Sequence, residues 1–431
     1  MATTIVLSLL LLLLYETKEL SDFFEISEDH AIDEDSFGPI FYFSPDNKQM
    51  AYTALSEGKW FVVLNGKEHK RYDAISRENI GFSSNGDFAY SAREGNDWMV
   101  VLNGKEEKRY DGVSQLTFSS DGRSLAYFAR EGRERFLVLN GEEGKRYEAL
   151  DLLAFSAKNN VAYAAREGDY WLAVLNGEEG KRYESVHRLT FSSDGESFAY
   201  SANENNRWLA VLNGEEGKKY ESADLLTFGP NGNLAYAARD NGNWFVVFNG
   251  EEGKRYESVH RLTFSPNGDF AYAAREDRNW LVVLNGEEQG TYERVNYLAF
   301  SSENDFAYTA RENEKWFVVL NGERQEDDYD NIAYITFSRR GDIVYTASEG
   351  FNWFVVLNGE EGERYNYLDS IVFSDRGDLA YIAGRGASYF VMVNGKEKGP
   401  FERVYGLRFE GNSFYYNILE ERRARILKEN I

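Results

Sequence analysis

The sequence contains no cysteine, and this absence excludes several kinds of site. A chain without Cys has no disulfide framework, no thiolate metal ligand and no cysteine nucleophile. Proline is also scarce, with 5 Pro against 38 Gly in 431 residues. That balance indicates many tight turns rather than proline-rich linkers.

Basic residues are in the minority, and their shortage excludes two classes of partner. The chain has 48 Lys and Arg against 72 Asp and Glu, a formal net charge of −24. Nucleic-acid binding draws most of its affinity from a basic face, and so does attraction to an anionic membrane surface. We therefore expect neither, and the charge favours solubility and, at most, cationic partners.

A long hydrophobic run is also missing, because the longest one covers only residues 5–15. A membrane-spanning helix needs about 20 residues, whereas this run has the length of a signal-peptide core. No Lys or Arg precedes it and no small-x-small cleavage site follows. We predict that residues 1–15 are an export signal and that the protein is extracytoplasmic, periplasmic or secreted. The alternative is a short buried or frayed segment, or a wrongly assigned start, in a cytoplasmic protein.

What the sequence does have is aromatic residues in a regular repeat. Aromatic residues make up 16% of the chain, and they favour strands. A Phe recurs at intervals of 36 or 37 residues after a first interval of 39, and an Asn-Gly pair recurs in step with it. The Phe positions are 43, 82, 118, 155, 191, 228, 264, 300, 337, 373 and 409. The segment NGEEGKRYESVHRLTFS begins at Asn176 and again at Asn249, two repeats later, which indicates duplication of a two-repeat block.

Each repeat divides into four short segments that read as strands. In one copy these are residues 262–264, 270–274, 280–284 and 289–293, with turns or loops between them. Asn-Gly between apolar runs is a strong hairpin signal, because both residues tolerate the positive φ of a type I′ turn. The third segment is apolar at every position, as in Trp316 to Leu320, so it must be covered on both faces. The fourth, as in residues 253–256, is polar and belongs at an outer rim.

Four-stranded sheets stacked face to face around an axis satisfy this pattern, so we predict an all-β fold, a single large β-propeller. Residues 43–431 form the repeat array of about eleven blades, ten full repeats and a partial one. The last copy lacks its fourth strand, and we expect the closing segment, residues 16–42, to supply it from a piece such as residues 22–26. An open array, a ten-bladed closure and two separate rings are the alternatives.

The repeat resembles the WD-like repeats of TolB-type propellers. Phe-Ser-Pro-Asp at residues 43–46, followed by Ala-Tyr at 51–52, matches that family's signature. Phe-Ser-Pro-Asn-Gly at residues 264–268, followed by Phe-Ala-Tyr at 270–272, matches it as well. The resemblance covers nearly everything from residue 41 onward and implies an extracytoplasmic or scaffold propeller, in some members fused to a catalytic domain. The blade number departs from the family's usual six to eight.

The sequence offers no catalytic constellation. Neither H-E-x-x-H nor G-x-S-x-G occurs, and Gly-Arg-Gly at 384–386 lies in a blade loop rather than at a strand-to-helix turn. The acidic residues between 28 and 35 lack the spacing of a calcium loop, so we interpret them as a solvated segment. We predict no catalytic residue, no metal site and no cofactor.

One repeated pattern is a candidate for binding. Arg followed by an acidic residue recurs in the loop before the third strand, which in a propeller lies on the same face as the connection between blades. Binding residues usually lie on loops of a rigid scaffold, and two equivalent histidines belong to the same face. The candidates are Arg93, Glu94, Arg130, Glu131, Arg166, Glu167, His187, Arg239, His260, Arg275 and Arg311. The structural alternative is that the charged pairs are surface salt bridges. We expect the Trp that begins most third strands to be inter-blade core rather than a sugar-binding platform.

These observations favour a non-enzymatic scaffold that binds a protein partner or a ligand through one loop face. The chain is expected to be a monomer. The alternatives are a hydrolase or lyase acting on glycans or peptides at the channel mouth, and a sensor of a small ligand or cation. A site in the channel rests on analogy of fold alone.

Overall fold

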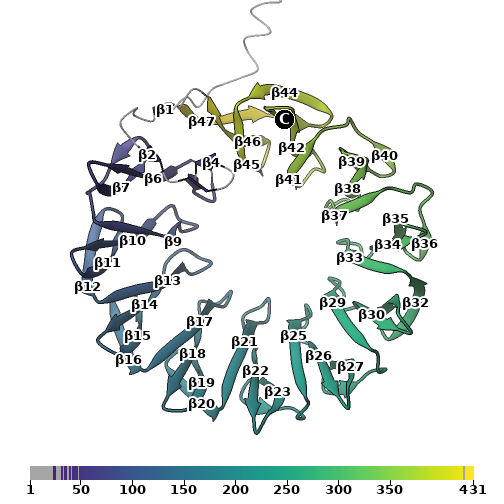
Figure 1. The fold of residues 1–431 in the computed structure, drawn as a ribbon, viewed down its shortest axis with the longest axis horizontal. Helices are drawn as coiled ribbons and strands as arrows, with labels where there is room; N and C mark the ends of the chain where they lie inside the picture. Colours follow the sequence, from purple (N-terminus) through teal and green to yellow (C-terminus); the bar gives the residue numbers. More distant parts are fainter. Residues whose placement is uncertain are drawn as a thin grey trace, which may run out of the picture. The chain divides into compact units, whose positions relative to one another are not determined.

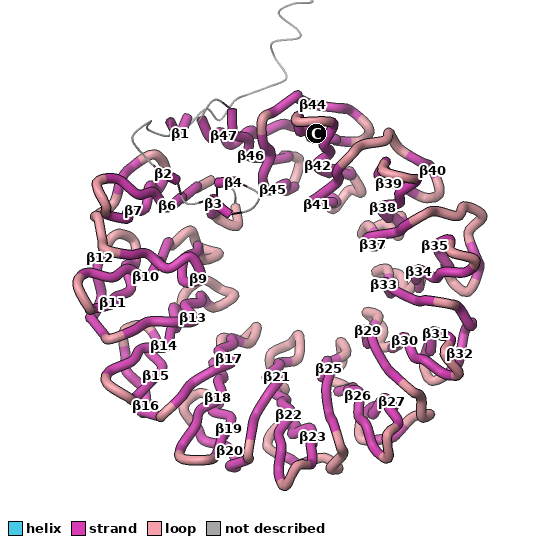
Figure 2. The backbone as a smooth tube through the Cα atoms, viewed as in Figure 1, coloured by secondary structure: helices cyan, strands magenta, loops and turns pink. Residues whose placement is uncertain are grey.

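The computed structural model describes residues 23–25, 31–32, 34–35, 38–39, 41–46, 48–420 and 423–431. Every regular element in these ranges is a β-strand (Figure 2). Among them there is no helix long and apolar enough to cross a membrane. The predicted export signal at residues 1–15 lies outside the described residues, as do Glu28, Asp29 and Asp33 of the acidic segment.

The strands of the described residues form eleven antiparallel sheets of four or five strands, and a two-stranded sheet, β3–β4 (Glu34–Asp35, Gly38–Pro39). The eleven sheets are the blades of a β-propeller, as the repeat predicted. Two compact units can be distinguished, residues 72–336 and residues 1–71 with 337–431.

Residues 72–336 contain seven complete blades, each built from four consecutive strands. In this unit the first strand of each blade lies on the inner side and the later strands lie further out (Figure 1). The blades are β9–β12 (Ala74–Phe82, Phe88–Glu94, Asp97–Leu102, Lys105–Tyr110), β13–β16 (Gly112–Phe118, Leu125–Glu131, Glu134–Leu139, Glu142–Tyr147), β17–β20 (Ala149–Phe155, Val161–Glu167, Tyr170–Leu175, Glu178–Tyr183), β21–β24 (Ser185–Phe191, Phe198–Glu204, Arg207–Leu212, Glu215–Glu216), β25–β28 (Ser222–Phe228, Leu234–Asp240, Asn243–Phe248, Glu251–Glu252), β29–β32 (Ser258–Phe264, Phe270–Glu276, Asn279–Leu284, Glu287–Tyr292) and β33–β36 (Arg294–Phe300, Phe306–Glu312, Lys315–Leu320, Glu323–Arg324).

The remaining blades follow the same order. They are β2 with β5–β8 (Ala31–Ile32, Phe41–Phe43, Met50–Ser56, Lys59–Leu64, Lys67–Glu68), β37–β40 (Asn331–Phe337, Ile343–Glu349, Asn352–Leu357, Glu360–Glu361), β41–β44 (Tyr367–Phe373, Leu379–Arg385, Ser388–Val393, Lys396–Phe401) and β45–β47 with β1 (Arg403–Glu410, Ser413–Glu420, Arg423–Asn430, Phe23–Glu25).

The last blade is completed from the N-terminal side, as predicted. Strand β1 pairs antiparallel with β47, with Phe23 opposite Arg425. Within the same unit this blade packs against the first one, as shown by one buried cluster that contains Tyr415 and Leu419 together with Met50 and Tyr52. Strand β47 therefore has a partner on the side where it would otherwise present an open edge.

The Asn-Gly pairs form the hairpin turns that the sequence predicts, and the structure shows why Asn is used. Asn249 and Gly250 have φ values of 49° and 86°, both positive as a type I′ turn requires. The Asn249 side-chain oxygen also accepts a hydrogen bond at 3.1 Å from the amide of Leu234, at the start of the second strand. One residue therefore makes the turn and fixes the neighbouring hairpin.

The third strands are buried on both faces, as their uniform hydrophobicity predicts. In β31 the central residues Leu281, Val282 and Val283 are at most 4% exposed. Their alternate side chains join different inter-blade clusters, because Leu281 and Val283 pack with the β25–β28 blade and Val282 with the β33–β36 blade. Trp171, Trp208 and Trp244, which precede the central residues of their own third strands, are half-buried at the edges of such clusters.

The inner and outer strands differ in length from the sequence-based expectation. The first strand runs for seven residues, as in Ser258–Phe264, instead of three, since pairing resumes beyond a bulge between His260 and Thr263. The fourth strand β28 covers only Glu251–Glu252, because the Gly253 amide bonds back to the Val246 carbonyl at 2.9 Å.

Candidate functional site: the loop face and the inner edge

The acidic members of the Arg-Glu pairs are held by cations of the outer strands. Glu131 Oε2 lies 2.9 Å from Arg146 of its own blade, and its other oxygen lies 3.3 Å from Lys108 of the preceding blade. Glu167 makes the equivalent pairs with Arg182 and, at 2.7 Å, with Lys145. Glu94 pairs with Arg109 at 2.5 Å. These side chains are about a quarter or more exposed, so solvent screens each pair and it contributes little to stability.

The arginines of the pairs turn to the linker that joins successive blades. Arg275 Nε lies 3.1 Å from Glu257, and Arg130 donates at 2.7 Å to the Asp111 carbonyl. The looser pairs are Arg166 with Glu148 at 3.7 Å, Arg239 with Glu221 at 3.7 Å and Arg311 with Glu293 at 4.0 Å, and Arg93 lies over the Trp98 ring at 5.9 Å.

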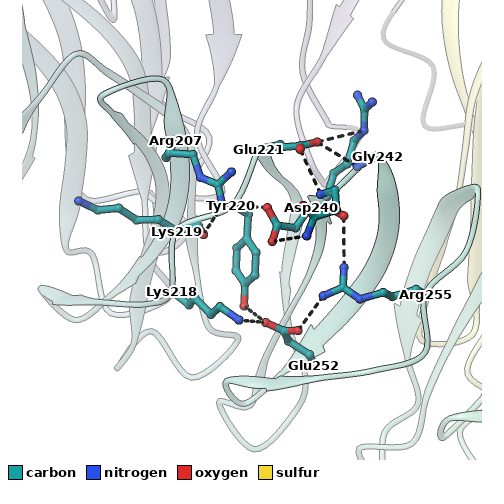
Figure 3. Close-up of polar contacts among 11 residues, drawn as sticks. Arg207, Lys218, Lys219, Tyr220, Glu221, Asp240, Gly242, Glu252 and Arg255 are labelled. Carbon is teal, nitrogen blue, oxygen red and sulfur yellow. Dashed lines mark hydrogen bonds and ion pairs between the residues drawn. The ribbon is translucent and has the colours of Figure 1, made fainter.

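The linker carboxylates in turn accept hydrogen bonds from the loops between the second and third strands. The Gly132 amide donates to Asp111 at 2.5 Å, and the Gly242 amide donates to Glu221 at 3.3 Å (Figure 3). The linkers and these loops therefore lie on one face, as the sequence argument assumed. The charged pairs on that face are engaged within the protein.

A second contact, which sequence reasoning missed, links the outer strands of neighbouring blades. Lys218 and the buried Tyr220 of one blade both contact Oε1 of Glu252 on the next, the tyrosine hydroxyl at 3.2 Å (Figure 3). Arg255 binds the other oxygen at 3.2 Å. Hydrogen bonding from Lys218 holds the pKa of Glu252 below its usual value. We call this arrangement of Lys, Tyr and Glu the blade clamp.

The blade clamp recurs along residues 72–336. Its tyrosines are among the most buried side chains, and burial raises the pKa of Tyr110 to about 12. The other clamps are Lys108 and Tyr110 with Glu143, Lys145 and Tyr147 with Glu179, Lys181 and Tyr183 with Glu216, and Lys254 and Tyr256 with Glu288.

The inner edge of the blades has a different character. Each first strand from β13 to β29 contains a bulge whose residue has a positive φ, and none of these residues is a glycine. They are Gln115 (52°), Leu152 (61°), Arg188 (55°), Leu225 (55°) and Arg261 (59°). Non-glycine residues in this region are strained by about 1 kcal/mol or more, and such strain concentrates at functional sites.

At every second blade junction the bulge residue reaches the third residue of the next first strand. Arg188 Nε lies 2.9 Å from Asp224, joining β21 to β25. The equivalent contacts are Gln115 to Asp151 at 2.9 Å, joining β13 to β17, and Arg261 to Asn296 at 2.9 Å, joining β29 to β33.

The two candidate histidines lie at this inner edge, each beside a Trp. The His187 ring centroid is 5.2 Å from that of Trp208, and the two residues line an open recess of about 270 Å³ with Arg188, Ser222 and Asp224. His260 lies 5.3 Å from Trp280 and contacts the Ser258 hydroxyl at 2.7 Å. Burial, and then the neighbouring Arg261, lower the pKa of His260.

The structure therefore separates the predicted residues into two groups. The Arg-Glu pairs belong to the loop face, whereas His187 and His260 belong to the inner edge. One contact joins them: Arg275 is the cross-strand partner of Trp280, which His260 touches. The described residues hold no group of three or more His, Asp or Glu arranged for a metal ion.

Sequence reasoning passed over Arg188, Asp224, Arg261 and Asn296. A signal was available, because the Asn-Gly turn and the Phe recur in the repeats while the third and fourth residues of the first strand change from one blade to the next. They alternate, since His187-Arg188 recurs as His260-Arg261 two blades later and Asp151-Leu152 recurs as Asp224-Leu225.

Similarity to known proteins is low. No protein-family model and no curated protein matches the chain. Among solved structures, the Dos1 propeller is 14% identical over 71% of this chain and 88% of its own, with a TM-score of 0.34. TolB from Acinetobacter baumannii is 12% identical over 55% and 78%, with a TM-score of 0.26. Virginiamycin B lyase from Staphylococcus aureus is 15% identical over 57% and 95%, with a TM-score of 0.29. At these identities the likeness is one of fold alone.

Proposed function

We propose that this protein is a non-enzymatic β-propeller scaffold. It binds a protein or a small ligand where the loop face meets the inner edge, with His187, Arg188, His260 and Arg261 in the contact surface. The monomeric state is part of the proposal.

The observation that carries the proposal is the contrast between constant and variable positions. The Asn-Gly turns and most of the blade clamps repeat from blade to blade, and they fix the frame. The third and fourth residues of the first strands differ between adjacent blades, although His187-Arg188 recurs as His260-Arg261 two blades later. In both of these copies the two side chains are exposed, and the fourth residue has a positive φ. A rigid frame with varied side chains on one edge is how repeat proteins present a binding surface.

Site-specific photo-crosslinking tests the proposal. A benzophenone side chain replaces Arg188 or Arg261, and in the matched control it replaces Ser193, an exposed turn residue of the β21–β24 blade. Crosslinked partner from the Arg188 and Arg261 positions and none from Ser193 is the expected result. Measurable turnover of a glycan or peptide substrate that is lost on mutating the inner edge would refute the non-enzymatic reading.

We also propose that the repeats are of the TolB-type WD-like kind and that the protein is extracytoplasmic. The first proposal is supported by the Phe-Ser-Pro-Asn-Gly turn at residues 264–268, in which the Ser265 hydroxyl accepts the Asp269 amide at 3.0 Å. The second is supported by the apolar run at residues 5–15. Fractionation of cells followed by N-terminal sequencing tests it, since a cytoplasmic protein with an intact N-terminus would contradict export.

A further inference from the structure

The three inner-edge junctions share one geometry but carry different formal charges. Gln115 with Asp151 has a net charge of −1, and Arg188 with Asp224 is neutral. Arg261 with Asn296 has a net charge of +1, because an amide oxygen occupies the place of the carboxylate. The amide accepts the same hydrogen bond at the same 2.9 Å distance, but it does not neutralise the guanidinium.

Arg261 keeps donors available for a ligand. Its side chain is exposed, and among the residues that the structure describes it makes no ion pair. Its contacts are the Asn296 oxygen and the Tyr297 ring, whose centroid lies 5.6 Å from the guanidinium carbon. A guanidinium has five N–H donors in a fixed plane, so one hydrogen bond leaves most of them unused. The hydrogen bond to Asn296 and the contact with the Tyr297 ring position this plane.

The surroundings of Arg261 add positive charge. Ser222 lines the recess at the neutral junction, and its equivalent at the charged junction is Arg294, the first residue of β33. Arg294 is exposed and, in the described part of the chain, makes no ion pair. Arg261 and Arg294 are together a local concentration of positive charge in a protein whose net charge is −24. His260, exposed beside Arg261 on β29, adds a ring nitrogen to the same surface.

We propose that the β29–β33 junction binds a single carboxylate group, with Arg261 as the principal donor and Arg294 beside it. This inference rests on the proposed function, since it names the chemistry that one part of the surface recognises. The guanidinium fork matches the two oxygens of a carboxylate. The acidic protein repels polyanions at longer range, so the site favours an isolated carboxylate over a nucleic acid or polyphosphate. A small organic acid and an acidic side chain of a partner present the same group.

Two probes distinguish these sources in a nuclear magnetic resonance titration that follows arginine side-chain signals. One is N-acetylglycine, and the other is a capped Ala-Ala-Glu-Ala-Ala peptide, with its Gln analogue as the neutral control. The variants are Asn296→Asp, which copies the neutral junction, and Asp224→Asn, which copies the charged one. Both substitutions are close to isosteric, and Arg123→Gln, at an 82% exposed turn arginine outside the contact surface, is the matched control.

The expected result is one carboxylate-binding site in the native protein. Asn296→Asp should bind the probes about fivefold more weakly than the native protein, which is the size of effect that an exposed charge pair has. Asp224→Asn should add a second site, and Arg123→Gln should leave the first unchanged. Tighter binding of the peptide than of N-acetylglycine indicates that the carboxylate belongs to a protein partner. Equal binding of both probes indicates that the site recognises the carboxylate group alone. Undiminished binding to Asn296→Asp, or no binding of either probe to the native protein, overturns the inference. The crosslinking experiment at Arg188 and Arg261 is independent of this titration. If the titration fails but crosslinking recovers a partner, the carboxylate inference is wrong and the proposed scaffold function still stands.

Discussion

Replacing Glu252 by Ala is expected to loosen the junction between two blades without affecting distant ones. The carboxylate receives Lys218, Arg255 and the hydroxyl of Tyr220, which is 1% exposed. Losing the acceptor of a buried hydroxyl costs about 1–3 kcal/mol, and each exposed ion pair adds at most about 1 kcal/mol. We expect a local loss of about 2 kcal/mol.

Hydrogen exchange measured by mass spectrometry reads this loss locally. An opening free energy lower by about 2 kcal/mol corresponds to exchange about 30-fold faster. The affected peptides should cover residues 215–220 and 251–256, and peptides from β9–β12 should be unchanged. Glu251→Ala is the matched control, because Glu251 is an exposed neighbour in the same turn. Equal acceleration in the two variants, or acceleration spread over all the blades, would refute the reasoning.

Three further predictions concern the same frame. Lysine hydrogen bonds lower the pKa of Glu179 and Glu216. The clamps therefore stabilise the protein above the ordinary carboxyl pKa of about 4.5, and this contribution is lost as the pH falls below that value and through the lowered pKa. Melting temperatures recorded from pH 6 to pH 3 should fall below about pH 4.5 and stay constant above it. Asn249→Ala removes both the tolerance of positive φ and the bond to Leu234 and should cost about 1–2 kcal/mol in denaturant unfolding, whereas Asn243→Ala, an exposed strand residue, should change stability by less than about 0.5 kcal/mol. Removing residues 1–26 should accelerate hydrogen exchange in β47, and unchanged exchange there would contradict the closing role of β1.

Sequence reasoning recovered the fold because the signals for it are local and repeated. The Asn-Gly turns, the apolar third strands and the missing last strand are each visible within one repeat. The length of the first strand was not visible in this way, because pairing continues past a bulge at residues such as Arg261. Arginine is not a residue type that indicates a positive φ in a sequence.

The candidate site was predictable only in part. The shared face of the linkers and loops followed from propeller geometry, and His187 and His260 were found as equivalent residues. The partners of those residues lie one blade away, as Asp224 does from Arg188, and the Glu252 clamp joins residues more than 30 positions apart. Contacts between blades are invisible to a pattern that is read within one repeat. The Arg-Glu pairs stood out because they recur, and recurrence in a repeat protein marks the frame as readily as the binding surface.

The blade clamp has a consequence for how such a chain grows. Glu179 and Glu252 are equivalent residues two blades apart, and each receives a Lys and a Tyr from the preceding blade. A recombination that duplicates the segment between them creates a new junction between blades. The clamp still forms at that junction, because the inserted blade carries the same glutamate acceptor as the blade whose place it takes. Blade number can then change in one genetic step, and the inner-edge residues of the new copy are free to diverge toward another ligand.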